Sequence, residues 1–204
     1  MRVITGRFRG RTIPFNVRRY GDASVTPDMI KEALFSVLGA DLSGGSFLDL
    51  FACSGQVGLE ALSRGCTTVV FNEKDRRRYE FIRGVLEDWG EDGEGVLVLN
   101  FPASRCMRLV HTRGMSFDCV FLDPPYEKVR GAPRLYGALL AEIGRYELLA
   151  PGGLAVVQHY VHNSMEETAG TLRLLERRVY GTNALAFYGH AERDAPVTPR
   201  APGT

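Results

Sequence analysis

The chain has 204 residues, of which 45% are hydrophobic and 24% are charged, and its formal net charge is +1. This length and composition are typical of one globular domain with a full core. The sequence has no run of about 18 apolar residues, so we expect no membrane-spanning helix. Its N-terminus lacks the apolar core of a secretory signal, so we expect a cytoplasmic protein.

Positive charge is concentrated at the start of the chain. Residues 1–21 contain six arginines and no acidic residue, which leaves the rest of the chain with a net negative charge. A basic segment on a mildly acidic body is typical of a protein that binds a phosphate backbone. Glycine and phenylalanine in GRFRGR suit close approach and base stacking. We predict RNA contacts by Arg7, Arg9 and Arg11; the alternative is a solvated strand pair.

The first elements are a basic extension and a helix. Residues 3–15 are expected as short extended segments, and residues 16–25 as a loop. Thr26 can cap a helix, Pro27 suits its first position, and apolar residues at helical spacing continue to Gly39. We therefore expect a basic N-terminal extension over residues 1–25 and the main domain over residues 26–190.

From residue 46 onward, strands and helices alternate. The expected strands are 46–52, 67–73, 95–100, 116–123 and 152–160, the expected helices are 55–65, 76–90, 104–112 and 133–146, and a hairpin follows over 172–189. This alternation predicts an α/β fold of Rossmann-like type, with a mostly parallel seven-stranded sheet, helices on both faces and a C-terminal antiparallel hairpin. The tail 191–204 is expected to be disordered.

The cysteines and histidines are scattered. The four cysteines, at positions 53, 66, 106 and 119, show no CxxC pairing. His159 and His162 are three residues apart but have no third ligand nearby. We therefore expect reduced thiols and no metal site.

Ligands of such sheets bind beyond the carboxyl ends of the strands, so the residues after each strand indicate function. Gly55 and Gly58 flank the start of a helix in DLFACSGQVGLE, where glycine lets a ligand approach the backbone. The loop does not match the dinucleotide fingerprint, and Asp49 brings a carboxylate into it. A carboxylate suits a cofactor with positive charge, such as S-adenosylmethionine, which has a sulfonium and an ammonium group.

Two further strand ends have polar residues. Glu73 follows the second strand and can accept both hydroxyls of a ribose, whether of NAD or of S-adenosylmethionine. Asp75 is a nearby competitor for this role. After the third strand, Asn100 or Ser104 is the candidate for contact with an adenine ring.

The fourth strand ends in Asp123, Pro124, Pro125 and Tyr126. Proline has no N–H to continue a sheet ladder, so this segment is expected to be a stiff turn. Asp123 and the Pro124 carbonyl can accept hydrogen bonds from an exocyclic amine, which favours the tetrahedral nitrogen that attacks a methyl sulfonium. Asp123 is also the expected proton acceptor, and Tyr126 can stack on a flipped-out base. The alternative is a rigid loop with a buried acid.

These segments resemble the RsmD family of Rossmann-fold, S-adenosylmethionine-dependent methyltransferases over about residues 2–190. RVITGRFRGRTIP is similar to the family's basic opening, TPDMIKEALFSVL to its first helix, FLDLFACSGQVGLEALSRG to its cofactor loop, FLDPPY to its catalytic turn and VYGTNALAFY to its closing strand. The resemblance implies methylation of the exocyclic N2 of one guanine in bacterial 16S ribosomal RNA.

The resemblance also implies roles for single residues. Glu73 aligns with the ribose acid, Asn100 lies in the adenine-contact region, and residues 123–126 align with the catalytic turn. The cofactor-loop residues are Asp49, Phe51, Ala52, Cys53, Ser54, Gly55 and Gly58. The implied partner is ribosomal RNA or a small-subunit assembly particle, and we expect a monomer without a metal or a membrane contact.

The chain departs from the family pattern at a few positions. Cys53 stands where the family usually has glycine, Ser24 and Val25 replace an arginine and a proline, and Pro102 occupies a usually polar position. Three alternatives therefore stay open: an amino methyltransferase acting on adenine or cytosine of RNA or DNA, a non-catalytic RNA-binding or assembly module, and a nicotinamide-dependent dehydrogenase. Asp49 argues against the last.

Overall fold

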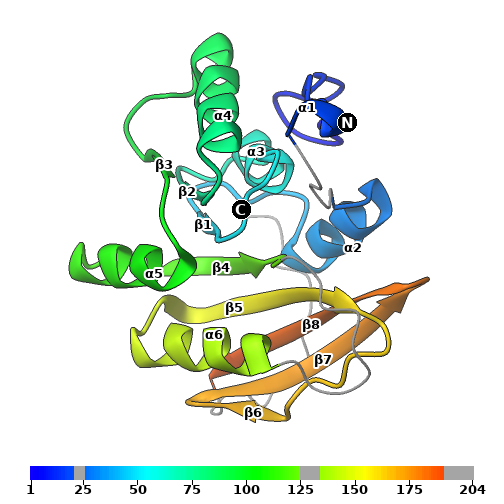
Figure 1. Ribbon diagram of the computed structural model, residues 1–204, viewed down its shortest axis with the longest axis vertical. Coiled ribbons are helices and arrows are strands. Elements are labelled where there is room, and N and C mark those ends of the chain that lie inside the picture. The colour runs from blue at the N-terminus through cyan, green and yellow to red at the C-terminus, as the bar shows by residue number, and fades with distance from the viewer. Residues whose placement is uncertain (21–25, 125–133, 191–204) are drawn as a thin grey trace.

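The computed structural model describes residues 1–20, 26–124 and 134–190 (Figure 1). The strands are β1 (Ser46–Asp49), β2 (Thr68–Asn72), β3 (Val96–Leu99), β4 (Phe117–Leu122), β5 (Leu149–Tyr160), β6 (Thr168–Ala169), β7 (Leu172–Tyr180) and β8 (Asn183–His190). The helices are α1 (Val17–Tyr20), α2 (Asp28–Leu38), α3 (Gln56–Ser63), α4 (Arg76–Trp89), α5 (Ala103–Thr112) and α6 (Arg134–Arg145).

The strands form one sheet in the order β3-β2-β1-β4-β5-β8-β7-β6. Strands β1 to β5 pair in parallel, and β8 runs antiparallel between β5 and β7. The predicted parallel sheet with a C-terminal hairpin is confirmed. The strand beyond the seven expected is β6, a two-residue edge strand too short to leave a periodic pattern in the sequence. The strand order reverses between β1 and β4, whose carboxyl ends form the switch point where ligands bind in such sheets.

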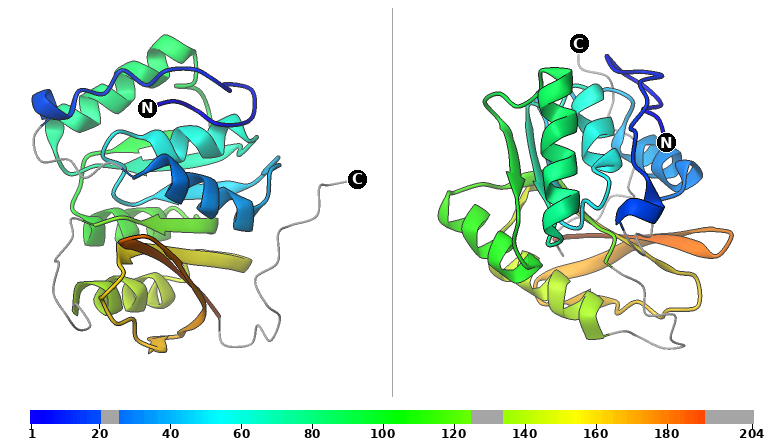
Figure 2. Two further views of the ribbon diagram at one scale, coloured as in Figure 1. Left: turned by 90° about the vertical axis from the view of Figure 1, so that its right-hand side faces the viewer. Right: turned by 45° about the horizontal axis from the view of Figure 1, so that its top comes forward.

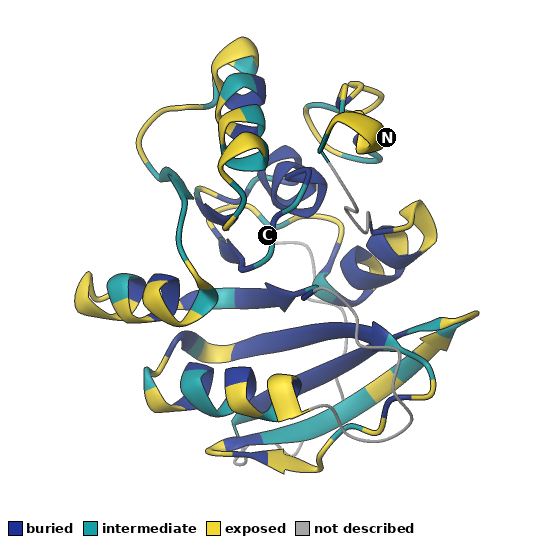
Figure 3. Cartoon of the chain, in the orientation of Figure 1, coloured by how far each residue is buried: buried dark blue, intermediate teal, exposed yellow. Residues whose placement is uncertain are grey.

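Helices cover both faces of the sheet, and burial is highest in the inner strands β1, β2, β4, β5 and β8 and in α3 (Figure 3). One face packs Phe47, Phe71 and Phe121 against α2, α3 and α4. The opposite face packs Leu48 and Val120 against α5 and α6. Alternate residues of each strand thus enter different cores, which explains why the strands read as continuous apolar runs.

The segment before α2 differs from the sequence prediction in two ways. Residues 17–20 form the single helical turn α1 inside the predicted loop. Thr26 does not cap α2: the N-cap position belongs to Pro27, without a side-chain cap bond. The Thr26 hydroxyl instead donates to Oδ2 of Asp123 at 2.9 Å. A residue whose sequence context suggests a helix cap thus contacts the tip of β4.

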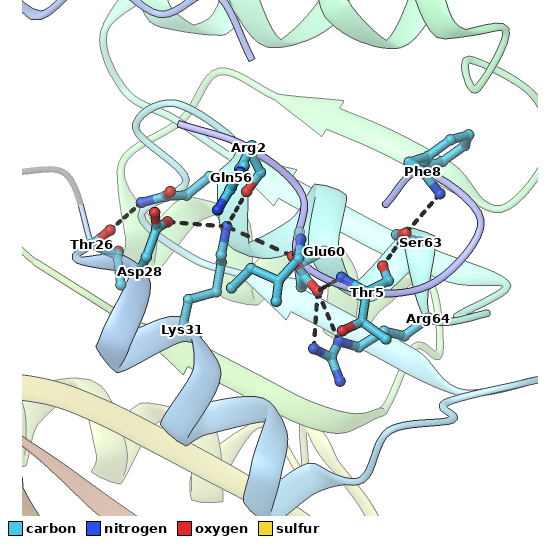
Figure 4. A network of polar contacts seen from close by, with 12 residues as sticks. Arg2, Thr5, Phe8, Thr26, Asp28, Lys31, Gln56, Glu60, Ser63 and Arg64 are labelled. Carbon is cyan, nitrogen blue, oxygen red and sulfur yellow. Dashed lines mark hydrogen bonds and ion pairs between the residues drawn. The ribbon is translucent and has the colours of Figure 1, made fainter. Parts of the chain in front are cut away.

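The basic N-terminal segment packs on the same core as the rest of the chain. Val3 and Ile13 are buried in the core that contains α2 and α3. The Ile4 and Thr5 N–H groups donate to the buried carboxylate of Glu60 at 2.8 and 3.0 Å (Figure 4). The segment runs alongside α4, with α1 beside that helix (Figure 2).

The cysteines form no disulfide with one another. All four are free, and three of them are buried. Within the described ranges, no group of three or more His, Cys, Asp or Glu side chains is placed to hold a metal ion. None of the helices in the described part of the chain combines the length and apolarity that crossing a bilayer requires.

Candidate active site

The first carboxylate of the site lies at the end of β1. Asp49 is buried, and its Oδ2 atom accepts a hydrogen bond from the Gly58 N–H at 3.1 Å. Burial raises the pKa of Asp49 from 3.8 to about 7. The Gly58 hydrogen bond opposes this rise, and the charges of Asp123 and Glu73 add to it. This carboxyl therefore favours a positively charged neighbour.

The loop after β1 is bound to the end of β2. The Ala52 N–H donates to the Asn72 carbonyl, and the Cys53 N–H donates to Oε2 of Glu73, both at 2.9 Å. Ala52 and Ser54 are buried, while Phe51 is half-buried against the core that contains α5 and α6. These bonds fix the loop that the sequence assigned to the cofactor.

Cys53 has a backbone conformation that favours glycine. Its φ is 50°, in the left-handed region that an L-residue with a Cβ atom disfavours. The family resemblance predicts glycine at this position, and the positive φ is a physical reason for that preference. Burial is also the main reason that the pKa of the Cys53 thiol rises to about 12, so the thiol is neutral at physiological pH.

The two glycines of the loop do different things. Gly55, with φ of 74°, makes the turn into α3, and its N–H donates to the Ala52 carbonyl. A Cβ atom on Gly58 would lie 2.2 Å from the Phe71 ring of β2, so glycine here lets α3 pack closely on the sheet. In this structure Gly58 acts through its N–H bond to Asp49. Its predicted cofactor contact stays a prediction.

The second carboxylate, Glu73, joins three segments of the chain. Besides the Cys53 N–H, it accepts the Asp75 N–H at 2.7 Å and Nη2 of Arg78 at 3.1 Å, both on Oε1. Asp75, its competitor in the sequence analysis, caps α4 by accepting the N–H groups of Arg77 and Arg78. Glu73 is therefore the acid that faces the loop.

Two asparagines hold the ends of β2 and β3 together. The Asn100 amide donates to the carbonyls of Glu73 and Lys74 at 2.7 and 2.9 Å, which commits the NH2 group of this predicted adenine contact to the backbone. The buried Asn72 amide donates to the carbonyls of Leu50 and Phe101. Sequence reasoning missed Asn72, although a polar residue at the end of an apolar strand was a usable signal.

The third carboxylate is Asp123 at the tip of β4. It is half-buried, and the Thr26 hydroxyl fixes its Oδ2 atom. Thr26 in turn accepts the side-chain amide of Gln56, from the first turn of α3, on its carbonyl at 2.6 Å. Pro124 is buried beside it, whereas Pro125 and Tyr126 lie outside the described residues. The acid thus has a defined position relative to the loop after β1.

These groups converge on one place. The electrostatic influences on the Cys53 thiol come from Arg78, Glu73, Asp123 and Asp49. Asp49 and Asp123 are 74 residues apart in sequence, but both lie near Cys53 because β1 and β4 are neighbours in the sheet. Three carboxylates with one arginine give this edge of the sheet an anionic character.

Two of the predicted RNA-binding arginines, Arg7 and Arg11, lie near the C-terminal end of α4, away from these carboxylates. The Arg7 guanidinium forms two hydrogen bonds with Glu91, at 2.7 and 2.5 Å. Arg11 stacks over the Trp89 ring at 4.7 Å. Arg9 is exposed. Arg7 is therefore largely paired within the protein, and Arg9 and Arg11 retain more capacity for an external phosphate.

The chain matches, over residues 1–189, the family model described as conserved hypothetical protein 95. It belongs to this family, the RsmD family.

Relatives of this RsmD-family chain span nearly its whole length. It is 33% identical to the Bacillus subtilis protein named "Putative rRNA methyltransferase YlbH" over 92% of the chain and 98% of the relative. It is 30% identical to ribosomal RNA small subunit methyltransferase D of Escherichia coli K12, over 92% of the chain and 89% of the relative. The solved structure of a hypothetical protein from Thermus thermophilus superposes with a TM-score of 0.73 at 32% identity, covering 92% of this chain and 98% of that one.

The left-handed Cys53 leads to a stability prediction for this RsmD-family protein. Cys53→Gly is expected to raise the free energy of unfolding by about 1 kcal/mol relative to Cys53→Ala, because only glycine removes the Cβ atom that disfavours φ of 50°. Both variants lose the same thiol, so their difference isolates the backbone effect. Urea denaturation of the two variants measures it, and equal midpoints would contradict the strain.

The raised pKa of Asp49 leads to a pH prediction. Between pH 3.8 and about 7, the folded protein holds a proton on Asp49 that the unfolded chain releases. The free energy of unfolding is therefore expected to fall as pH rises through this range, by at most ~1.4 kcal/mol per pH unit from this group. Denaturation at pH 5 and pH 7 should show a weaker fall in Asp49→Asn. Parallel pH profiles for the two proteins would contradict this assignment.

Proposed function

We propose that this chain transfers a methyl group from S-adenosylmethionine to the exocyclic N2 of a guanine in small-subunit ribosomal RNA. The observation that carries the proposal is the meeting of Asp49, Glu73 and Asp123 at the ends of β1, β2 and β4, around a loop held by backbone hydrogen bonds. The family relationship adds the class of reaction.

The residues present fit this cofactor. Asp49 is a buried carboxyl whose pKa is raised by burial and by two other acids, so a ligand with positive charge lowers the cost of ionising it. Glu73 lies at the end of β2, where an acid binds ribose hydroxyls in related sheets. A sulfonium cofactor supplies an electrophilic methyl group when bound. The loop from Phe51 to Gly55 is proposed to enclose its amino-acid part.

The chain's own residues then act on the guanine amine. Asp123 is proposed to accept an N–H of the amine, orient its lone pair and take up its proton. Thr26 holds the Asp123 carboxylate in position through a 2.9 Å hydrogen bond. The Pro124 carbonyl is proposed as the second acceptor, and Tyr126 is proposed to stack on the flipped-out base.

The wider organisation follows the same proposal. Residues 26–190 are proposed to form the methyltransferase domain. Residues 1–25 are proposed to contact RNA through Arg9 and Arg11, while Arg7 holds this segment to the protein by pairing with Glu91. We propose a cytoplasmic monomer that acts on ribosomal RNA or on a small-subunit assembly particle. Light scattering of the purified protein tests the monomer.

One assay decides between the reaction classes. The protein is incubated with methyl-labelled S-adenosylmethionine and small-subunit ribosomal RNA transcribed in vitro, or small subunits rebuilt from that RNA, and the nucleosides are then analysed by mass spectrometry. The expected product is N2-methylguanosine. Methylated adenosine or cytidine would overturn the guanine assignment. Calorimetric binding of the cofactor without transfer to any of these substrates would favour a non-catalytic RNA-binding module.

A further inference from the structure

A second group of exposed arginines lies beside the candidate active site: two belong to the basic N-terminal extension, and two lie on α4 and had no role assigned from the sequence. Arg76 and Arg77 begin α4, and their side chains are 71% and 67% exposed. Arg18 and Arg19 are exposed on α1. We name these four residues the α1–α4 arginine surface.

Aromatic packing places the two halves of this surface together. Tyr20, which ends α1, lies 5.2 Å from the ring of Phe81 in α4 and stacks on Phe15 at 4.8 Å. Phe81 is about one helical turn beyond Arg77 on the same helix. Both helices therefore present their arginines at the same end of α4, and Figure 2 shows α1 against α4.

This end of α4 is also the end nearest the carboxylates. The next residue, Arg78, bonds Glu73 and acts electrostatically on the Cys53 thiol. The Arg78 side chain is only 23% exposed, whereas those of Arg76 and Arg77 point into solvent. Three consecutive arginines of α4 therefore run from the surface into the candidate site. The surface thus borders the end of β2 and the loop after β1, next to the candidate active site.

Helix stability does not explain these charges. The first turn of α4 has no acidic residue and opens with three arginines, at the positive end of the helix dipole. Each of these arginines has an acid nearby: Arg76 pairs with Glu80, Arg77 lies 3.8 Å from Asp75, and Arg78 bonds Glu73. The uncompensated positive charge of the surface therefore comes from Arg18 and Arg19 on α1, and the exposed guanidinium groups of Arg76 and Arg77 add donors for phosphate groups supplied from outside.

The N-terminal arginines occupy the other end of the same helix. Arg7 and Arg11 lie against Glu91 and Trp89, at the C-terminal end of a helix that is about 21 Å long. Arg7 is already paired with an acid. Arg18 and Arg19 differ from it, because within residues 1–20, 26–124 and 134–190 they form no ion pair with an acid.

We propose that the α1–α4 arginine surface binds the RNA phosphates that flank the target nucleotide. The inference rests on the proposed function, because it names the part of the protein that holds the RNA beside the site. RNA contacts would then be strongest at the N-terminal end of α4 and weaker toward Trp89.

The test uses the full chain and charge-neutralising variants. The site variant combines Arg18→Gln, Arg19→Gln, Arg76→Gln and Arg77→Gln. The control combines Arg108→Gln and Arg113→Gln, two exposed arginines of α5 and its C-terminal cap; it removes two charges rather than four, so losses are compared per charge removed. A second comparison is Arg7→Gln with Arg11→Gln. Binding to the same transcribed ribosomal RNA is measured over a range of salt concentrations, with cofactor binding and methyl transfer in parallel.

The site variant is expected to bind RNA at least tenfold more weakly at low salt. The slope of log affinity against log salt should fall by about 0.7 to 0.9 for each phosphate that the protein no longer neutralises. Cofactor affinity should stay unchanged, and both other variants should change less. An unchanged slope in the site variant, or an equal loss in the α5 control, would overturn this inference while wild-type methylation still stands. Absence of methylation by the wild type would instead reject the proposed function.

Discussion

Asp123→Ala is expected to lower methyl transfer by about 10²- to 10⁴-fold while leaving cofactor affinity near the wild-type value. The carboxylate is proposed to orient the amine and take its proton, and each of these contributions has this order of magnitude. Asp49 and Glu73 stay in place to hold the cofactor, because their hydrogen bonds go to the loop, α3 and the start of α4 rather than to Asp123. Single-turnover transfer to transcribed ribosomal RNA and calorimetric titration of the cofactor measure the two effects.

Asp123→Asn is the matched control for the charge. It keeps an acceptor oxygen at nearly the same position but cannot take a proton. Activity between those of the wild type and Asp123→Ala would assign part of the effect to orientation and part to proton transfer. Because Asp123→Ala also removes the acceptor of the Thr26 hydroxyl, its unfolding midpoint must be measured beside its activity. Near wild-type turnover by a folded Asp123→Ala would show that the carboxylate is not catalytic.

Glu60→Leu is expected to cause the largest loss of stability, about 3–5 kcal/mol, because it removes the buried carboxylate that pairs with both Lys31 and Arg64. Glu60 and Lys31 are fully buried, and their charged atoms lie 3.7 Å apart (Figure 4). The Glu60 carboxylate also accepts two N–H groups of the N-terminal segment, at Ile4 and Thr5. The segment should therefore loosen, and trypsin should cut faster at its arginines. Urea denaturation and limited proteolysis measure the two effects.

A double variant separates charge from packing in this cluster. Glu60→Leu combined with Lys31→Met removes both members of the Lys31–Glu60 pair and leaves Arg64 without Glu60, so its loss of stability should be smaller than the sum of the two single losses. The exposed control is Glu87→Leu on α4, whose partner Arg83 is also exposed, and it should change stability by less than about 0.5 kcal/mol. Additive losses in the double variant would mean that the pair does not couple across the core.

The cluster also connects stability with the proposed activity. Lys31 donates to the Arg2 carbonyl at 2.7 Å and belongs to α2, the helix that follows Thr26. Thr26 in turn fixes Asp123 and binds Gln56 of α3. The N-terminal segment, α2 and α3 therefore share polar contacts (Figure 4) that extend to the proposed catalytic acid. We expect Glu60→Leu to lower transfer as well as stability.

Much of the fold was predictable from the pattern of the chain. Apolar strands, four to six residues long in β1 to β4, alternate with amphipathic helices from residue 46, and strand, helix, strand connections require a parallel sheet. The strand-end acids Asp49, Glu73 and Asp123 were identifiable for the same reason, since parallel strands bring their carboxyl ends to one edge. The short strand β6 and the single turn α1 were not predicted, because two to four residues contain too little periodicity.

Other features depend on contacts between residues far apart in the chain. Thr26 has the sequence context of a helix cap, but Asp123, 97 residues later, takes its hydroxyl. Arg7 has the context of an RNA ligand, but Glu91 lies close enough to pair with it. The order of residues was enough to infer the longer helices and strands and the acids at the strand ends, because both depend on local spacing. The partners of those side chains could not, because packing in three dimensions brings together donors and acceptors that sequence distance does not relate.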